Sequence, residues 1–385
     1  MGPLAAVRRR IAGLDVIRGV VMVLMAIDHV RVYAGVPAGG PDPGIFFTRW
    51  VTHFCAPAFA FLAGTSAFLL GLKLADRRAL ARYLVTRGLL LVALELTVIR
   101  LSWTFNLDYS HFLLAGVIWM LGWCMVLLAG LIWLPTLAVG ILGVLIIFMQ
   151  DAFGIVGRAM PQTVRWFWEF LYPVGMDLQL GADGPTINVL YCLVPWIGVM
   201  AAGYGFGAVV VREPAERRRR CLLIGGAATL LYVAIAGYLT FYIPRPASSP
   251  MPALFYMLNQ RKYPASQLFL LMTLGPTILL LPLADRARGW IADFFGTFGR
   301  VPMFYYLLHI PLIHAIALIV WRARDGAIHS EWFAIAPFAQ VPPSQRWSLS
   351  LLYLVFAIVI ALLYVPCRWY ANVKARGTSR WTHYI

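Results

Sequence analysis

Charged residues are scarce in this sequence, and acidic ones are the scarcest. Only 12% of the 385 residues are charged and 61% are hydrophobic, and 16 Asp and Glu stand against 32 Lys and Arg. With a mean hydropathy of +0.77, the chain has more apolar side chains than one soluble core could bury. This composition excludes a soluble globular protein.

Several common motifs are also missing. The five cysteines form no C-x-x-C pair, so they are interpreted as small buried hydrophobic residues without a disulfide framework. There is no P-loop, no dinucleotide-binding glycine fingerprint, no clear internal repeat and no cleavable signal peptide. The net charge of +16 does not indicate a nucleic-acid partner, because the basic residues form short clusters between apolar stretches.

Long apolar stretches dominate what is present. About ten of them have the 17 to 25 residues needed to cross the hydrocarbon core of a bilayer. They predict an all-α, polytopic integral membrane bundle in a single domain, residues 1–385. The predicted spans are 14–34, 46–70, 83–103, 111–134, 136–153, 187–211, 222–242, 264–283, 302–321 and 349–364.

The distribution of basic residues predicts the orientation of these spans. Roughly two thirds of Lys and Arg fall on one side of the alternation, including residues 8–10, 73–87 and 212–220. Cytoplasmic loops carry such an excess, so both termini are predicted to lie in the cytoplasm. The bilayer is thus the first expected partner, and the oligomeric state stays open, a homo-oligomer included.

The first predicted span carries an unusual polar stripe. At 100° per residue, Asp15, Arg18 and His29 fall within about 80° of one another, and His29 lies about 16 Å along the helix from Arg18. Asp28 points about 100° away, toward Arg31 or a neighbouring helix. Ionisable groups in hydrocarbon normally face the bundle interior or a water-filled cavity, so this stripe is expected to face inward.

Further polar groups occur at the same predicted depth. His53 shares a face of the second span with Pro57, Ala60 and Gly64, a small-residue stripe typical of close helix contacts. Arg100 and Asn106 lie where the third span ends, and Tyr305, His309 and His314 lie on the ninth. A neutral imidazole at this depth is suited to proton transfer.

Two mechanistic classes fit a basic inner mouth and imidazoles near the outer face. The first is a transmembrane acyltransferase in which Arg and Lys bind acyl-CoA phosphates and a His acts as base or acyl carrier. The alternative is a proton-coupled transporter or exporter with a relay of Asp and His. A metal site on His309 and His314 is disfavoured, because their spacing of five positions puts them about 140° apart on a helix. No metal is expected.

Six segments carry a resemblance to a known family. They begin with RIAGLDVIRGVVMVLMAIDHVRVYAG, FTRWVTHFCAPAFAFLAGTSAFL and LLLVALELTVIRLSWTFN, and continue with LYCLVPWIGVMAAGYGFG, KYPASQLFLLMTLGP and GRVPMFYYLLHIPLIH. Together they resemble bacterial membrane proteins related to the catalytic domain of heparan-alpha-glucosaminide N-acetyltransferase. The clearest shared marks are L-D-x-x-R-G at Leu14 and P-x-F-x-F-x-x-G-x-S at Pro57.

The resemblance implies acetyl transfer from cytoplasmic acetyl-CoA to a glycan or amine acceptor across the membrane, here the inner (plasma) membrane of a bacterium. That enzyme has a key His between its first two spans, but residues 36–47 here contain none. His29 and His53 flank this gap and are the candidates for general base or acyl carrier, with Asp28 orienting the imidazole. Asp15 and Arg18 are expected at the inner end of the path. The remaining predicted residues line the outer acceptor site: Arg100, Asn106, Tyr305 and His309.

Overall fold

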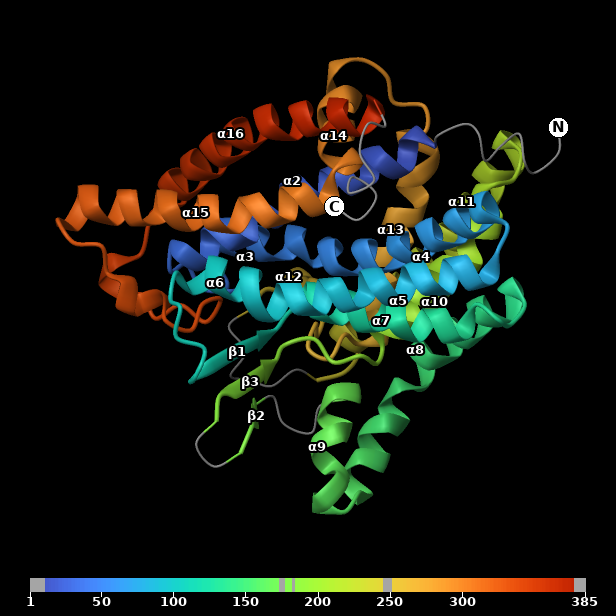
Figure 1. Cartoon of the computed structure of the whole chain (residues 1–385), viewed down its shortest axis with the longest axis horizontal. Helices are drawn as coiled ribbons and strands as arrows, with labels where there is room; N and C mark the ends of the chain where they lie inside the picture. Colours follow the sequence, from blue (N-terminus) through green and yellow to red (C-terminus); the bar gives the residue numbers. More distant parts are fainter. Residues whose placement is uncertain (1–10, 173–176, 182–183, 245–250, 377–385) are drawn as a thin grey trace.

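The structure is a computed structural model that describes residues 11–172, 177–181, 184–244 and 251–376. It is mostly helical, and the long helices run side by side (Figure 1). The helices of the first half are α2 Ala12–Tyr33, α3 Pro43–Trp50, α4 Cys55–Leu74, α5 Arg77–Leu94, α6 Arg100–Thr104, α7 Val117–Leu131, α8 Thr136–Ala159 and α9 Gln162–Leu171. Those of the second half are α10 Trp196–Val210, α11 Pro214–Phe241, α12 Ala253–Leu258, α13 Gln267–Ala284, α14 Trp290–Arg300, α15 Pro302–Asp325 and α16 Leu349–Arg376.

Short irregular helices join some of these elements. A 3-10 turn, η1 Val51–Phe54, connects α3 to α4, and a π-helical turn, η2 Glu95–Ile99, connects α5 to α6. Two further 3-10 turns, η3 Ser330–Phe333 and η4 Pro343–Gln345, lie between α15 and α16. Since π turns are rare and often mark functional sites, η2 is a position of interest.

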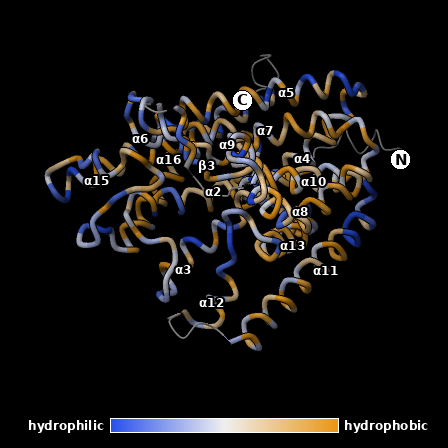
Figure 2. The backbone as a smooth tube through the Cα atoms, turned by 90° about the horizontal axis from the view of Figure 1, so that it is seen from below, coloured by the Kyte–Doolittle hydropathy of each residue, from blue (hydrophilic) through white to orange (hydrophobic). Residues whose placement is uncertain are grey.

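Six helices in the described part of the chain are long and apolar enough to cross a membrane. They are 43–74, 136–159, 214–241, 267–284, 302–325 and 349–376, and each coincides with a predicted span. The structure therefore supports a helical membrane protein. Figure 2 shows the helices as mainly hydrophobic, with hydrophilic residues gathered at the basic ends of α5 and α11.

The other four predicted spans differ from simple apolar helices. Helix α2 carries Asp15, Arg18, Asp28 and Arg31 inside its 22 residues, and the run from α5 to α6 is interrupted by η2. Helices α7 and α10 have 15 residues each. At 1.5 Å per residue they are shorter than the hydrocarbon core, so the ten-span topology remains a prediction.

A small sheet corrects the all-α prediction. Strands β1 Phe112–Ala115, β2 Asp177–Gln179 and β3 Thr186–Val189 form it in the order β1-β3-β2, with β1 parallel to β3 and β2 antiparallel to β3. The predicted spans 111–134 and 187–211 were wrong at their starts, where the chain forms β1 and β3. Short apolar runs do not distinguish a strand from a buried helix by periodicity.

Helices α2 and α4 each make a close backbone contact with a neighbouring helix. A Cβ atom on Gly19 of α2 would lie 1.8 Å from the Phe295 carbonyl oxygen of α14, and one on Gly64 of α4 would lie 1.9 Å from the Met200 oxygen of α10. The small-residue face predicted for the second span is therefore confirmed as a helix contact, since only glycine allows this approach. Helices α15, α2, α4, α5 and α7 follow one another across the bundle (Figure 1).

Candidate functional site

A pocket of about 360 Å³ opens between α2, α4, α5, α7 and α15. Its basic lining residues are Arg18, Arg87, Arg300 and Lys374. Its apolar lining residues include Met22, Phe59, Met125, Val117 and Met303. The combination of several cations with an apolar interior suits a ligand that is anionic at one end and apolar along its length.

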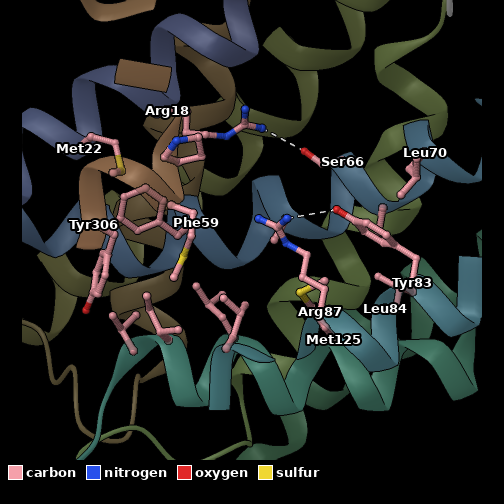
Figure 3. Close-up of a pocket in the computed structure, with 18 of the residues that line it drawn as sticks. Arg18, Met22, Phe59, Ser66, Leu70, Tyr83, Leu84, Arg87, Met125 and Tyr306 are labelled. Atoms are coloured by element: carbon pink, nitrogen blue, oxygen red, sulfur yellow. Dashed lines mark hydrogen bonds between the residues drawn. The ribbon is translucent and has the colours of Figure 1, made fainter. Parts of the chain in front are cut away.

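Two guanidinium groups define the basic end of the pocket (Figure 3). Arg18 donates to the Ser66 hydroxyl at 3.0 Å and to the Gly299 carbonyl at 3.3 Å, and it forms an ion pair with Asp15 at 3.3 Å. Arg87 donates to the Tyr83 hydroxyl at 3.2 Å. These bonds fix the side chains that face the pocket, as recognition of a phosphate requires.

Asp15 lies beside this pocket in a second one. The second pocket has a volume of about 410 Å³ and lies between α2 and α14, with Asp15, Asp293 and Arg288 in its wall. Arg300 lines both pockets. The predicted inner pair Asp15 and Arg18 is therefore brought together, with only Arg18 facing the first pocket.

Tyr306 marks the other end of the first pocket, away from Arg18 and Arg87 in Figure 3. Its backbone oxygen lies 2.7 Å from His309 Nδ1, and His309 Nε2 lies 2.8 Å from His29 Nδ1. The two imidazole rings stack with centroids 4.9 Å apart, and Trp103 packs edge-on against His29 at 4.8 Å. Tyr306 thus connects the wall of the pocket to a pair of histidines from the first and ninth predicted spans, which do not themselves line the pocket.

Asp28 forms its hydrogen bonds with Arg31. Arg31 donates twice to Asp28 Oδ1, at 3.0 and 2.8 Å, and once to the Val36 carbonyl at 2.8 Å. The imidazole of His29 is instead bonded by His309. Asp28 therefore lies next to the histidine pair, and the charge of its carboxylate is balanced by Arg31 on the same helix.

His53 and Tyr305 are buried polar groups. His53 is 2% exposed on η1, its ring lies 5.3 Å from that of Phe269, and both ring nitrogens lack a hydrogen-bond partner among the described residues. Tyr305 stacks on His309 at 5.1 Å, and its buried hydroxyl also lacks a partner in the described part of the chain. Such groups are costly to bury, so both are candidates for contact with a ligand.

Arg100 and Asn106 organise the loop before β1. Arg100 donates to the carbonyls of Phe112, Asn106 and Asp108, and its guanidinium lies 4.4 Å from the Tyr109 ring. Hydrogen bonds from the Ser110 hydroxyl and backbone lower the pKa of Asp108 to about 2. The predicted outer residues therefore divide into two groups, with Arg100 and Asn106 in this loop and Tyr305 and His309 beside His29.

Two residues near the site were missed in the sequence. Glu95 on η2 is 1% exposed and accepts from the backbone N–H groups of Ile118 at 2.8 Å and Trp119 at 3.2 Å, at the start of α7. Lys262 is 7% exposed, stands over the rings of Tyr191 and Tyr263, and interacts electrostatically with Asp28, His29 and His53. A lone Glu in an apolar run and a Lys on the predicted outer side were the available signals.

No group of three or more His, Cys, Asp or Glu in the described residues could hold a metal ion. The family model for heparan-alpha-glucosaminide N-acetyltransferase, catalytic, matches residues 10–244. The chain belongs to this family. Membership confirms the resemblance and indicates a membrane acetyltransferase in general terms. The heparan-alpha-glucosaminide N-acetyltransferase match includes Arg18, His29 and Glu95, whereas Lys262 and His309 lie beyond it. Comparison with curated proteins gives no match.

Proposed function

We propose that the protein transfers an acetyl group from cytoplasmic acetyl-CoA to an amine or hydroxyl of a sugar or amine acceptor on the extracytoplasmic side. It would act as a multi-pass protein of about ten spans in the bacterial inner membrane, with both termini in the cytoplasm. The family match gives the reaction type, and the pocket gives the reason for choosing acyl-CoA as donor.

The observation that carries the proposal is the lining of the pocket between α2, α4, α5, α7 and α15. Its basic residues, Arg18 and Arg87 among them, match the phosphates of CoA, and its apolar lining matches the pantetheine arm. Tyr306 at the other end is bonded through its carbonyl to His309, which is bonded to His29. The thioester would therefore arrive beside His29, about 16 Å along α2 from Arg18.

In the proposed reaction His29 acts as general base. Its Nε2 accepts a proton from the acceptor amine or hydroxyl while the acceptor atom attacks the thioester carbon. The C–S bond breaks, and the proton passes from His29 to the departing CoA sulfur, so charge and protons balance. Asp28 would stay paired with Arg31 beside the imidazoles, and the loop held by Arg100 and Asn106 would border the acceptor entrance. His53 is the second candidate for base or acyl carrier.

Purified protein in detergent tests the proposal directly. We expect it to bind acetyl-CoA, to hydrolyse it slowly without acceptor and to acetylate an added amino sugar; a transporter should do none of these. Arg18→Ala should weaken acetyl-CoA binding by about ten- to a hundredfold, because a charge-assisted contact contributes about 1.5 to 3 kcal/mol. Arg219→Ala is the matched control, since Arg219 is exposed on α11.

The two histidine variants then identify the base. His29→Ala should keep acetyl-CoA binding and lower turnover by about a hundredfold or more. Turnover that survives in His29→Ala and collapses in His53→Ala would assign the chemistry to η1. Normal turnover in both variants would contradict the histidine mechanism.

A further inference from the structure

A backbone carbonyl fixes which nitrogens donate and which accept in the hydrogen bonds of the two imidazoles. The Tyr306 oxygen can only accept, so a hydrogen bond of 2.7 Å to His309 Nδ1 requires a proton on Nδ1. His309 is 0% exposed, and no ion pair joins it to an acidic group in the described residues, so the neutral imidazole is the form that burial favours. Its Nε2 is then an acceptor.

The protonation of His309 determines the protonation of His29 through the hydrogen bond between them. With His309 Nε2 as an acceptor, His29 Nδ1 at 2.8 Å must donate, and a neutral His29 then has an unprotonated Nε2. His29 is only partly buried, and its Nε2 has no hydrogen-bond partner among the described residues. It is therefore the one nitrogen of the pair with a lone pair that no hydrogen bond from the described residues occupies.

We infer that His309 is a positioning residue that holds His29 in the tautomer with a bare Nε2, by relaying the acceptor character of the Tyr306 carbonyl. The inference rests on the proposed function, in which His29 Nε2 accepts the proton of the acceptor. Tyr306 then contributes twice: its side chain lines the pocket, and its backbone carbonyl accepts the hydrogen bond from His309 that begins the relay.

The surroundings of His309 suit this role. Its ring stacks on Tyr305 at 5.1 Å and on His29 at 4.9 Å, and Tyr306 packs against its edge at 5.0 Å. These ring contacts surround His309 in the orientation in which both of its nitrogens are bonded. His29 is thereby supplied with a fixed acceptor on the side away from the ligand.

Kinetic variants test the relay. His309→Phe keeps a ring but removes the acceptor, whereas His309→Gln places an amide oxygen near the position of Nε2. We expect His309→Phe to lower kcat by about a hundredfold with unchanged acetyl-CoA affinity, and His309→Gln to recover at least about tenfold of this loss. Should His309→Phe fail to fold, His309→Asn replaces it, because its shorter side chain does not extend to the Nε2 position.

His314→Phe is the matched control. His314 is also buried on α15, at 1% exposure, but its Nδ1 lies 3.2 Å from the Ser102 carbonyl and it does not contact His29. Its kcat should stay within about threefold of the wild-type value, since no positioned base is affected. An equal loss of kcat in both variants would show a general effect of losing a buried imidazole and would overturn the inference.

Nitrogen-15 NMR of histidine-labelled protein gives a readout independent of turnover. The signals lost in His29→Ala identify the His29 nitrogens, and we expect Nδ1 protonated and Nε2 bare in the wild type, with this preference lost in His309→Phe. A wild-type His29 protonated at Nε2, or an unchanged kcat in His309→Phe, would overturn the inference. The expected tautomer in a protein that neither binds nor uses acetyl-CoA would instead contradict the proposed function and leave the relay intact.

Discussion

Gly64→Ala should destabilise the protein more than any ordinary helix substitution. An alanine Cβ at this position would lie 1.9 Å from the Met200 carbonyl oxygen and 2.8 Å from the Tyr204 nitrogen. Real Cβ atoms essentially never approach within 3.0 Å, so α4 and α10 must separate by at least 1.1 Å at this point. Both obstacles are backbone atoms, which cannot move aside as a side chain can.

The separation has a cost that can be bounded. Overpacking in a close-packed interior costs typically about 1 to 3 kcal/mol, and here a second contact on the same helix pair, Gly203 with Phe61, would be disturbed as well. We expect a loss of about 3 kcal/mol in the free energy of unfolding. The movement would also displace Ser66, which holds Arg18, so acetyl-CoA binding should weaken in parallel.

Thermal unfolding in detergent measures the effect, with Gly226→Ala as the control. Gly226 lies on α11, and a Cβ there would meet no atom within 4 Å. Alanine favours a helix over glycine by about 0.8 to 1 kcal/mol, so this control should be neutral or stabilising. A Gly64→Ala protein that unfolds at the wild-type temperature would refute the contact between α4 and α10.

Three further predictions concern Glu95, Arg100 and the topology. Glu95→Gln should lower the unfolding temperature, because a carboxylate at the start of α7 stabilises it by about 0.3 to 2 kcal/mol; an unchanged temperature would show that its charge is not needed there. Arg100→Lys should increase proteolysis of residues 105–111, since one ammonium cannot replace a guanidinium that donates to three carbonyls; limited digestion with mass spectrometry gives the rate, and wild-type resistance would contradict the clamp. Cysteine labelling should place residues 212–220 in the cytoplasm and residues 155–171 outside, and the opposite accessibility would reverse the side from which acetyl-CoA enters.

Local sequence patterns predicted the long helices better than they predicted the residues at which those helices begin, end or are interrupted. Length and hydropathy identified the six long apolar helices, and small-residue periodicity identified the face of α4 that packs on α10. Strands β1 and β3 escaped prediction because their hydrogen bonds come from strands distant in the sequence, and a four-residue segment contains no sign of such a partner. The interruption at η2 escaped for a related reason, since an acid within an apolar helix does not reveal a π turn.

The sequence indicated single candidate residues of the site but not the contacts between them. The predicted stripe on the first span contains Arg18, which lines a basic pocket, and His29, which is bonded to His309; the roles of both residues stay predictions. No pattern could show that the partner of His29 would be His309, because the two residues are 280 positions apart in the chain. Arg100 was grouped with the acceptor site on depth alone, whereas its directional hydrogen bonds belong to a loop.

The parallel pairing of β1 with β3 also orders events during biosynthesis. Phe112 pairs with Thr186, which is 74 residues further along the chain. At about 5 to 20 residues per second, β1 waits about 4 to 15 seconds for this partner while α7, α8 and α9 are made. During that interval the edge groups of β1 need water or another cover, because an unpaired strand edge is prone to wrong pairing. Insertion of α8 and synthesis of α9 therefore precede completion of the sheet, and a pause in translation between α9 and β3 should be the step most sensitive to misassembly.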